Sequence, residues 1–217
     1  MHYRNQATQR SKSRKLRNMS TVSVAILAGG QSRRMGCNKA FLELGSSTVL
    51  EKIIAAVTPL TVEIMLIADK VGDFTRFSLP VFPDLDPGLG PIGGLHTALV
   101  HAPSEVVLIL ACDLPFLKTE FLYFLVGSLQ NHQAVVPRNN KGLEHLCAIY
   151  TRSCLTAVKS SIARQQLHMA SFHQDLDIRI LEPAEWQTFD SSQTLFLNLN
   201  APADYQRAQT LVEEESP

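Results

Sequence analysis

The stretch Val22–Gly45, VSVAILAGGQSRRMGCNKAFLELG, determines how the rest of the chain is interpreted. Its first part, Val22–Leu27, is an apolar run that is too short for a helix and suits a buried strand. Gly29 and Gly30 follow at once, and at glycines the backbone can turn sharply and approach a ligand closely. The stretch therefore predicts a strand that ends in a tight turn.

Three cationic side chains follow this turn, Arg33, Arg34 and Lys39. Glycine amides hold phosphate oxygens, guanidinium groups bind them in pairs, and a lysine adds a point charge. A strand, a glycine turn and a basic loop together predict a site for a triphosphate, with the amides of Gly29 and Gly30 as donors.

Two common phosphate-binding patterns do not fit this loop. A P-loop has four residues between its glycines, followed by Lys and Ser or Thr. Here five residues separate Gly30 from Gly36, and Ala40 follows Lys39. The dinucleotide pattern G-x-G-x-x-G is missing as well. The loop therefore belongs to another class of phosphate binder.

The loop resembles L-A-G-G-x-S-x-R-M-G-x-D-K, a pattern of nucleotidyltransferases that activate a phosphorylated small molecule with a nucleoside triphosphate. Within that superfamily the sequence most resembles the MobA-like molybdenum cofactor guanylyltransferases, which join GMP to molybdopterin. Asn38 is the one departure, because the family has Asp there. Its amide oxygen can still orient a guanidinium or an ammonium group. The resemblance implies catalytic roles for Arg34 and Lys39, and GTP contacts from Leu27, Ala28, Gly29, Gly30 and Lys39.

The bulk composition fits one globular domain. The chain has 217 residues, of which 45% are hydrophobic and 18% charged. Six of its 20 basic residues and none of its 20 acidic residues lie in 1–19, so the remainder has a net charge of −6. An acidic body argues against general binding of nucleic acid. Residues 1–20 are polar and aperiodic, and we expect them to be disordered.

The cysteines and the hydropathy indicate a cytoplasmic protein. Cys37, Cys112, Cys147 and Cys154 lack C-x-x-C pairing and zinc-site spacing, so we expect free thiols in a reducing compartment. The sequence has no apolar run of the roughly 18 residues that a membrane span needs. Its N-terminus also lacks the apolar core of a secretory signal.

A parallel strand–helix–strand unit follows the loop. Thr48–Val57 has helical periodicity, and Val62–Ile67 is predicted to be the second strand. Strand ends in such sheets face the ligand crevice, so Asp69 is placed to meet a ribose or a base. A plain turn role for Asp69 is equally compatible with the sequence.

The run Pro83–Gly94 has four glycines and three prolines, and a helix is predicted from about Ile92. It resembles the family pattern D-x-x-x-x-x-G-P-x-x-G, which implies that Asp84 binds the guanine nucleotide. A carboxylate can accept from guanine N1–H and N2–H₂ together. Asp86 is the rival for this role, and the spacing to Gly90 favours Asp84.

Glu105–Ala111 is almost purely apolar and is predicted to be the central strand. It leads to Cys112-Asp113-Leu114-Pro115-Phe116, where Asp113 is a candidate Mg²⁺ ligand. An Asp after an apolar strand could also simply cap a helix. The resemblance to the family pattern C-D-x-P-[FY] implies that Asp113 binds the metal and the triphosphate and is catalytic.

Further segments are assigned more briefly. We predict helices over Glu120–Leu129 and Thr151–Ala163, and strands over Ala134–Pro137 and Asp177–Leu181. Residues 165–174 are ambiguous. Leu143–Tyr150 resembles the family segment P-L-x-A-x-Y, in which a strand across the sheet reaches the substrate. His145 stands where Pro is usual, and it receives no catalytic role.

Near the C-terminus, N-x-N-A-P-A-D precedes a helix predicted to end at about Val212. It resembles the closing motif of the family, N-x-N-[TA]-P-x-D, which implies that Asn198 and Asn200 lie beside the metal on the pterin side of the site, where their amides can orient phosphate or a metal-bound water. Simple capping of the helix by Asn200 is the alternative, and Pro202 suits the first helical turn.

Together these features predict one three-layer α/β/α domain over residues 21–212, with tails at 1–20 and 213–217. The expected sheet is mainly parallel and Rossmann-like, as in nucleotide-diphospho-sugar transferases. The resemblance implies GMP transfer from GTP to (Mo-)molybdopterin with Mg²⁺ and release of pyrophosphate. We expect a cytoplasmic monomer that transiently contacts cofactor-insertion proteins, and neither nucleic acid nor membrane as a partner.

Other functions remain open from the sequence alone. A cytidylyltransferase acting on the same pterin would tend to have L-A-A-G in place of Leu27–Gly30. A sugar-1-phosphate nucleotidyltransferase is disfavoured by the short chain. A non-catalytic nucleotide-binding or cofactor-binding relative is suggested by the departures at Asn38 and His145. A pyrophosphate-release assay separates these possibilities.

Overall fold

The computed structural model describes residues 22–29, 38–69 and 71–215. The predicted disordered tail and the loop residues Gly30, Arg33 and Arg34 lie outside this range. The strands are β1 (Val22–Leu27), β2 (Glu43–Leu44), β3 (Ser47–Thr48), β4 (Ile64–Ile67), β5 (Val81–Phe82), β6 (Val106–Ala111), β7 (Ala134–Asn139), β8 (Gly142–Leu143), β9 (Cys147–Thr151) and β10 (Ile178–Leu181). The helices are α2 (Val49–Val57), α3 (Pro91–His101), α4 (Thr119–Gly127), α5 (Leu155–Ala163), α6 (Pro183–Trp186) and α7 (Pro202–Glu215).

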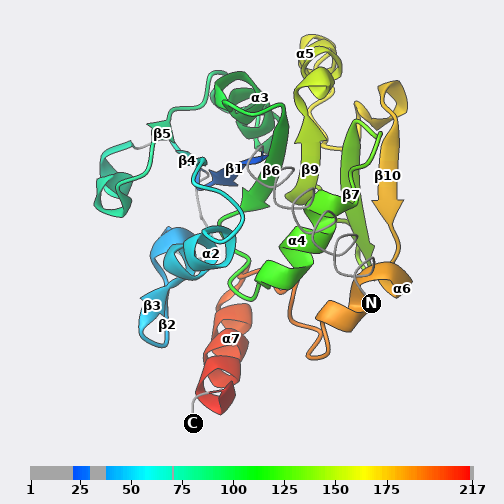
Figure 1. Cartoon of the computed structure of the whole chain (residues 1–217). Coiled ribbons are helices and arrows are strands. Elements are labelled where there is room, and N and C mark those ends of the chain that lie inside the picture. The colour runs from blue at the N-terminus through cyan, green and yellow to red at the C-terminus, as the bar shows by residue number, and fades with distance from the viewer. Residues whose placement is uncertain (1–21, 30–37, 70, 216–217) are drawn as a thin grey trace, which may run out of the picture.

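The main sheet has eight strands in the order β10-β7-β9-β6-β1-β4-β5, with β8 paired to β7 at the side. Figure 1 shows these strands side by side from β5 at the left to β10 at the right. β1 runs parallel to both β4 and β6, β5 runs parallel to β4, and β10 runs parallel to β7, whereas β9 runs antiparallel to both β6 and β7. The predicted, mainly parallel sheet is therefore confirmed.

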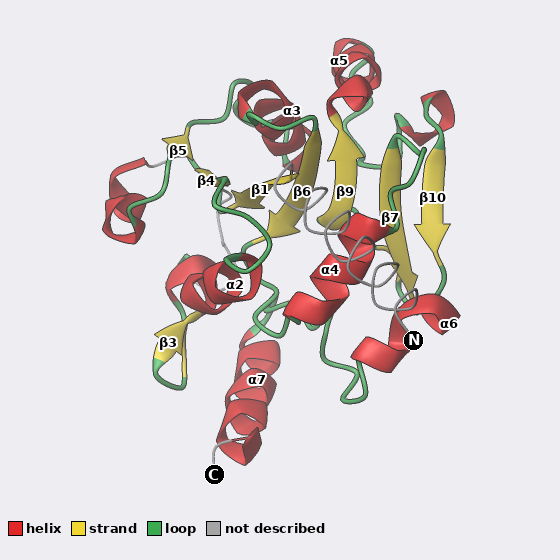
Figure 2. Cartoon of the chain, in the orientation of Figure 1, coloured by secondary structure: helices red, strands yellow, loops and turns green. Residues whose placement is uncertain are grey.

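Helices cover both faces of the sheet, as the red and yellow elements of Figure 2 show. Side chains of α2, α4 and α7 pack in one hydrophobic cluster, and those of α3 and α5 pack in another. β1 supplies both clusters by alternation: Val24 and Ile26 face the first, and Ala25 faces the second. Burial of each large aliphatic side chain stabilises the fold by about 1.5–3 kcal/mol. The three layers predicted from the sequence are thus present.

The order in which strands are added to the sheet changes side at β1. From β1 it passes through α2 to β4 on one side, and then through β5 and α3 to β6 on the other side. The two crossover helices lie on opposite faces, so their ends leave a crevice at the carboxyl ends of β1, β4 and β6. The last residues of these strands, Leu27, Ile67 and Ala111, are paired in register.

Most element boundaries agree with the predictions to within two residues, and the exceptions have local causes. The short edge strand β5 and the β2–β3 hairpin were not predicted, because two-residue strands have no periodicity to detect. The helix expected from Thr151 begins instead with a 3₁₀ turn over Arg152–Cys154. The closing helix continues to Glu215, three residues beyond its predicted end and into the predicted tail.

Two further observations bear on predictions made from composition. Cys112, Cys147 and Cys154 are free thiols, as expected, while Cys37 lies outside the described residues. Within the part of the chain that the structure describes, no helix has both the length and the apolar character needed to cross a bilayer.

Candidate active site

A cavity of about 650 Å³ opens at the carboxyl ends of β1, β4 and β6. Seven of its lining residues were predicted from the sequence to bind nucleotide or metal: Leu27, Ala28, Gly29, Lys39, Asp69, Asp84 and Asp113. The topology therefore gathers into one cavity residues that the sequence separates by up to 86 positions. Gly30 and Arg34, predicted for the same site, lie outside the described residues.

The centre of the site is a contact between Lys39 and Asp113. The Lys39 ammonium Nζ lies 3.0 Å from Asp113 Oδ2, and each side chain is only 16% exposed. Nζ also donates to Asn200 Oδ1 at 2.6 Å. The predicted phosphate-binding lysine and the predicted metal ligand thus form one charged pair. A neutral amide completes this polar cluster.

The three residues of this cluster, Lys39, Asp113 and Asn200, come from three different segments of the chain, and backbone hydrogen bonds position each of these segments. Lys39 opens the 3₁₀ turn Lys39–Phe41. Asp113 follows β6, and its backbone carbonyl accepts from the Leu199 N–H at 3.2 Å. Asp204 Oδ2 accepts from the N–H groups of Asn200 and Ala201, at 3.0 and 2.8 Å. The bond between Leu199 and Asp113 fastens the segment before α7 to the end of the central strand, and Asp204 holds the start of α7 itself.

Asn38 has a different role from the one predicted. Its side-chain oxygen accepts from the Ala40 N–H at 3.0 Å and caps the 3₁₀ turn, while Lys39 Nζ is bonded to Asp113 and Asn200. The Asn38 amide oxygen therefore does not orient the Lys39 ammonium, because the short side chain reaches the nearby backbone first. The guanidinium groups that it was also predicted to orient lie outside the described residues.

Exchange of this residue tests the capping role. Asn38→Asp keeps an acceptor for the Ala40 N–H, so we expect kcat to change by less than about tenfold in either direction. Asn38→Ala removes the cap and should lower the free energy of unfolding by about 1 kcal/mol. Denaturant unfolding and turnover of the three proteins provide the measurement. Inactive wild type beside an active Asn38→Asp variant would contradict this and identify a lost catalyst.

The amide of Gly29 does not point at a ligand. The N–H groups of Ala28 and Gly29 both donate to the carbonyl oxygen of Ile67, at 2.8 and 3.0 Å. The prediction that the Gly29 amide cradles phosphate is thus corrected, because pairing with β4 continues past the end of β1. Gly29 still lines the cavity.

Asp84 lies at the other end of the cavity, beside the start of α3. Its Oδ1 accepts from the buried Thr97 hydroxyl at 2.7 Å. Burial raises the pKa of Asp84, and the Thr97 hydrogen bond opposes this rise. Asp86, its rival in the sequence, instead lies 2.6 Å from His96 Nδ1 and does not line the cavity. The geometry therefore favours Asp84 as the residue that meets a ligand.

Two glycines shape this end of the cavity. Gly90 has φ +70°, a conformation that side-chain-bearing residues rarely adopt, and it directly precedes the first turn of α3. At Gly94 a Cβ atom would lie 3.1 Å from Leu27 Cδ1. The matched glycines of the sequence motif thus allow α3 to start at the cavity and to pack closely against the end of β1.

Asn198 and Asn200 were predicted to lie on the pterin side. Neither is among the residues that line the cavity, and Asn200 instead contacts Lys39. The position of the pterin stays a prediction. Asn200 does not cap α7 with its side chain, since Asp204 supplies the acceptor for the backbone there.

Two residues of the β8–β9 connection, Glu144 and Leu146, were not singled out from the sequence. Leu146 lines the cavity, and its carbonyl accepts from the Ala111 N–H at 2.7 Å. Glu144 accepts from Asn139 Nδ2; burial raises the pKa of Glu144, and the charge of Asp113 adds to this rise. The P-L-x-A-x-Y resemblance was the signal available for both, because it marked this segment as a substrate contact.

Burial makes the Cys112 thiol unsuited to covalent catalysis. Desolvation, with a further contribution from the Asp113 carboxylate, raises the pKa of Cys112 to about 12. The thiolate is the nucleophilic form of cysteine, and near neutral pH it is essentially unpopulated at such a pKa. The cysteine beside Asp113 is therefore a packing residue.

His145 packs against His173 with ring centroids 4.7 Å apart, and neither residue is among those that line the cavity. Burial lowers the pKa of His145; burial, together with the charge of His145, lowers that of His173 from 6.5 to about 4. The unfolded chain then takes up protons first, so stability that is complete above about pH 6.5 is lost as the pH falls toward 4.

We therefore expect His173→Leu to weaken the fall in melting temperature between pH 7 and pH 5, because the substituted side chain no longer titrates. Differential scanning calorimetry at several pH values provides the measurement. His168→Leu is the matched control, since His168 is exposed in the same loop. Parallel pH profiles for wild type and His173→Leu would refute the interpretation.

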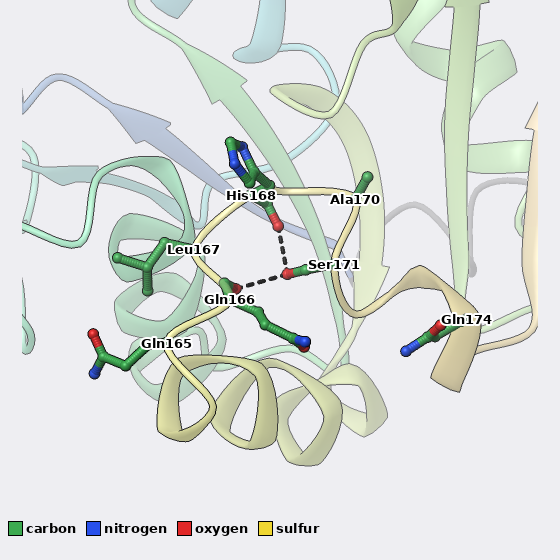
Figure 3. A pocket seen from close by; sticks show the side chains of 7 residues that line it. All are labelled: Gln165, Gln166, Leu167, His168, Ala170, Ser171 and Gln174. Carbon is green, nitrogen blue, oxygen red and sulfur yellow. Dashed lines mark hydrogen bonds between the residues drawn. The ribbon is translucent and has the colours of Figure 1, made fainter.

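A second hollow, of about 540 Å³, lies in the loop that follows α5 (Figure 3). Figure 3 shows the Ser171 hydroxyl between the carbonyl oxygens of Gln166 and His168, at 2.7 and 2.6 Å. Its lining has no Lys, Arg, Asp or Glu. Since this hydroxyl is already engaged and no charged side chain is among the lining residues, the hollow lacks groups that would hold a triphosphate.

Comparisons with known proteins agree with this site. The family model described as the MobA-like NTP transferase domain matches residues 24–177. A probable molybdenum cofactor guanylyltransferase from Carboxydothermus hydrogenoformans is 34% identical over 189 residues, covering 87% of this chain and 95% of the relative.

Solved structures give the same picture of the fold. Molybdopterin-guanine dinucleotide biosynthesis protein A from Archaeoglobus fulgidus superposes with a TM-score of 0.77 at 25% identity, over 88% of this chain and 99% of that one. The 2-C-methyl-D-erythritol 4-phosphate cytidylyltransferase from Thermus thermophilus has a TM-score of 0.67 at 20% identity, over 88% and 98% of the two chains. The predicted nucleotide-diphospho-sugar transferase-like architecture is confirmed. From the family match over residues 24–177, and from the relative that shares 34% of its residues over most of both chains, we conclude that this chain belongs to the MobA-like NTP transferase family.

Proposed function

We propose that this protein transfers GMP from GTP to (Mo-)molybdopterin, forming the guanine dinucleotide cofactor and releasing pyrophosphate. The observation that carries the proposal is the Lys39–Asp113 pair, 3.0 Å apart, in the cavity at the strand ends. Relatives named as molybdenum cofactor guanylyltransferases support the choice of substrates. In this reaction the terminal phosphate of the pterin attacks the α-phosphorus of GTP in line.

Such a transfer depends on positioning and charge rather than on a covalent intermediate. Lys39 supplies a positive charge for the phosphates, and its hydrogen bonds to Asp113 and Asn200 fix the ammonium before GTP arrives. Arg34, which lies outside the described residues, is proposed to add a second cation. Cys112 stays protonated and takes no part, because its pKa is raised to about 12.

A magnesium ion fits this donor set only together with the substrate. Asp113 Oδ2 is bonded to Lys39, whereas Oδ1 has no hydrogen bond within the described residues. The same residues contain no cluster of three or more His, Cys, Asp or Glu side chains suited to a metal. Mg²⁺ is typically held by one or two carboxylates, phosphates and waters. Asp113 would thus be the protein ligand, and the bound ion would neutralise charge on the phosphates.

Guanine selection is proposed to come from the α3 end of the cavity. Asp84 can accept from guanine N1–H and N2–H₂, and neither adenine nor cytosine offers this pair of donors. Thr97 fixes the carboxylate through Oδ1 at 2.7 Å. Asp69, on the neighbouring strand end, is proposed to contact the ribose, since it lines the same cavity.

The test is pyrophosphate release measured with GTP, CTP or ATP, each with and without Mg²⁺ and molybdopterin. We expect turnover only with GTP, Mg²⁺ and the pterin together. Turnover with CTP instead would identify a cytidylyltransferase. Tight GTP binding without any turnover would identify a non-catalytic relative.

The cellular setting is part of the same proposal. We infer a cytoplasmic monomer that transiently contacts proteins that insert the molybdenum cofactor. Free Cys112, Cys147 and Cys154 support a reducing compartment. Size-exclusion chromatography with light scattering tests the monomer, and a dimer mass would overturn it.

A further inference from the structure

The Lys39 ammonium is held by two acceptors that lie far apart in the sequence. Asp113 lies 74 residues beyond Lys39, and Asn200 lies 161 residues beyond it. The bond to the neutral amide, at 2.6 Å, is shorter than the bond to the carboxylate, at 3.0 Å. Asn200 is therefore a full partner of the ammonium and not a distant neighbour.

The carboxylate is also the group that the proposed function assigns to the metal. If Asp113 holds a divalent cation, even through the free Oδ1, the Lys39 ammonium 3.0 Å from Oδ2 would be repelled by that charge. The bond from Lys39 to Asp113 would therefore weaken when the metal–nucleotide complex binds. Asn200, which has no charge to attract the metal strongly, is free to keep its bond to the ammonium.

The fold fixes Asn200 where this task needs it. Asp204 Oδ2 accepts from the Asn200 N–H at 3.0 Å. The Leu199 N–H donates to the Asp113 carbonyl at 3.2 Å. Asn200 is thus tied through the backbone to the strand end that carries Asp113. The fold therefore sets the distance between the Asn200 amide and the Asp113 carboxylate.

From these contacts we propose that Asn200 is a positioning residue for Lys39: it retains the ammonium in the site when Asp113 passes from the lysine to the metal–nucleotide complex. The inference rests on the proposed function. It replaces the pterin-side role predicted for Asn200 by an indirect role on the nucleotide side. Without Asn200, the lysine that has left Asp113 would be free to leave the phosphates as well.

A double-mutant cycle with Lys39 tests this role. Asn200→Ala should lower kcat by about tenfold, the loss expected when a charged group loses one hydrogen bond. The Kd for GTP, measured without pterin, should change less than about twofold, because the retained charge acts mainly as pyrophosphate departs. In a Lys39→Met background the same substitution should change kcat by less than about twofold.

Additive losses in the cycle, or an equal loss of GTP affinity and kcat, would overturn the proposal. Asn200→Asp, which keeps an acceptor in place, should recover part of the lost kcat, whereas a purely structural role of Asn200 would leave the ratio of kcat to Kd unchanged. Gln206→Ala on the exposed side of α7 is the matched control and should behave like wild type.

A second readout needs neither GTP nor turnover, so failure of the proposed function can be told apart from failure of this inference. Lysine acetylation of the nucleotide-free protein is followed by mass spectrometry, with exposed Lys159 as the internal reference. Asn200→Ala should increase the labelling of Lys39 relative to Lys159 several-fold, because the ammonium loses one of its two partners. Unchanged labelling would show that Asn200 does not hold Lys39.

Discussion

Replacement of Asp113 by alanine is expected to reduce turnover of GTP and molybdopterin by at least a thousandfold, or about 4 kcal/mol of transition-state stabilisation. Two losses combine in this variant. The proposed metal loses its protein ligand, and the Lys39 ammonium, now 2.6 Å from Asn200 only, loses its counter-charge. No other described carboxylate lies within salt-bridge distance of Lys39, so none can take over.

The fold should survive this change, because Asp113 is tied to Leu199 through its backbone carbonyl and not through its side chain. Pyrophosphate release and the melting temperature of Asp113→Ala and Asp113→Asn provide the measurement. Asp86→Asn is the matched control, since Asp86 pairs with His96 outside the cavity lining. Retention of more than about a tenth of wild-type kcat by Asp113→Ala, with the fold intact, would exclude Asp113 as the metal ligand.

The positions of Asp113, Asp69 and Asp84 could be predicted because each follows a segment whose secondary structure and burial are determined by its own sequence. An apolar run such as Val106–Ala111 has to be buried, and parallel strands bring their carboxyl ends to one edge. Polar residues directly after these runs therefore meet in the crevice. The sequence order of strands and helices was enough to place the cavity.

The contacts inside the site could not be predicted, because they depend on distances across the fold. Nothing in the local sequence indicates that Asn200 reaches Lys39 rather than capping α7, since Asp204 is available as the cap and only the packed structure decides between them. Likewise, the Gly29 amide was assigned to phosphate because its pairing with Ile67 of the neighbouring strand is invisible in sequence. Asn38 caps its own turn for a local reason that was overlooked.

Lys39→Ala is expected to lower kcat by a factor on the order of 10², with a much smaller effect on GTP affinity. The ammonium interacts with the phosphates most strongly when negative charge accumulates on departing pyrophosphate, so the transition state loses more than the bound ground state. In the nucleotide-free protein Lys39 also neutralises Asp113, and both side chains are only 16% exposed. Removal of the lysine therefore leaves a poorly hydrated carboxylate that has lost its cation.

The unpaired Asp113 carboxylate of Lys39→Ala can be detected separately from the loss of the lysine charge. Because the carboxylate in Lys39→Ala no longer faces an ammonium group 3.0 Å away, Mn²⁺ as a probe should bind the nucleotide-free variant several-fold more tightly than wild type. Lys39→Arg should not restore kcat, since a planar guanidinium cannot occupy the position of a compact ammonium between two acceptors. Lys159→Ala, at an exposed position of α5, is the control for loss of a positive charge. If Lys39→Ala raises only the KM for GTP and leaves kcat unchanged, the lysine contributes uniform binding, and its proposed role in the transition state is wrong.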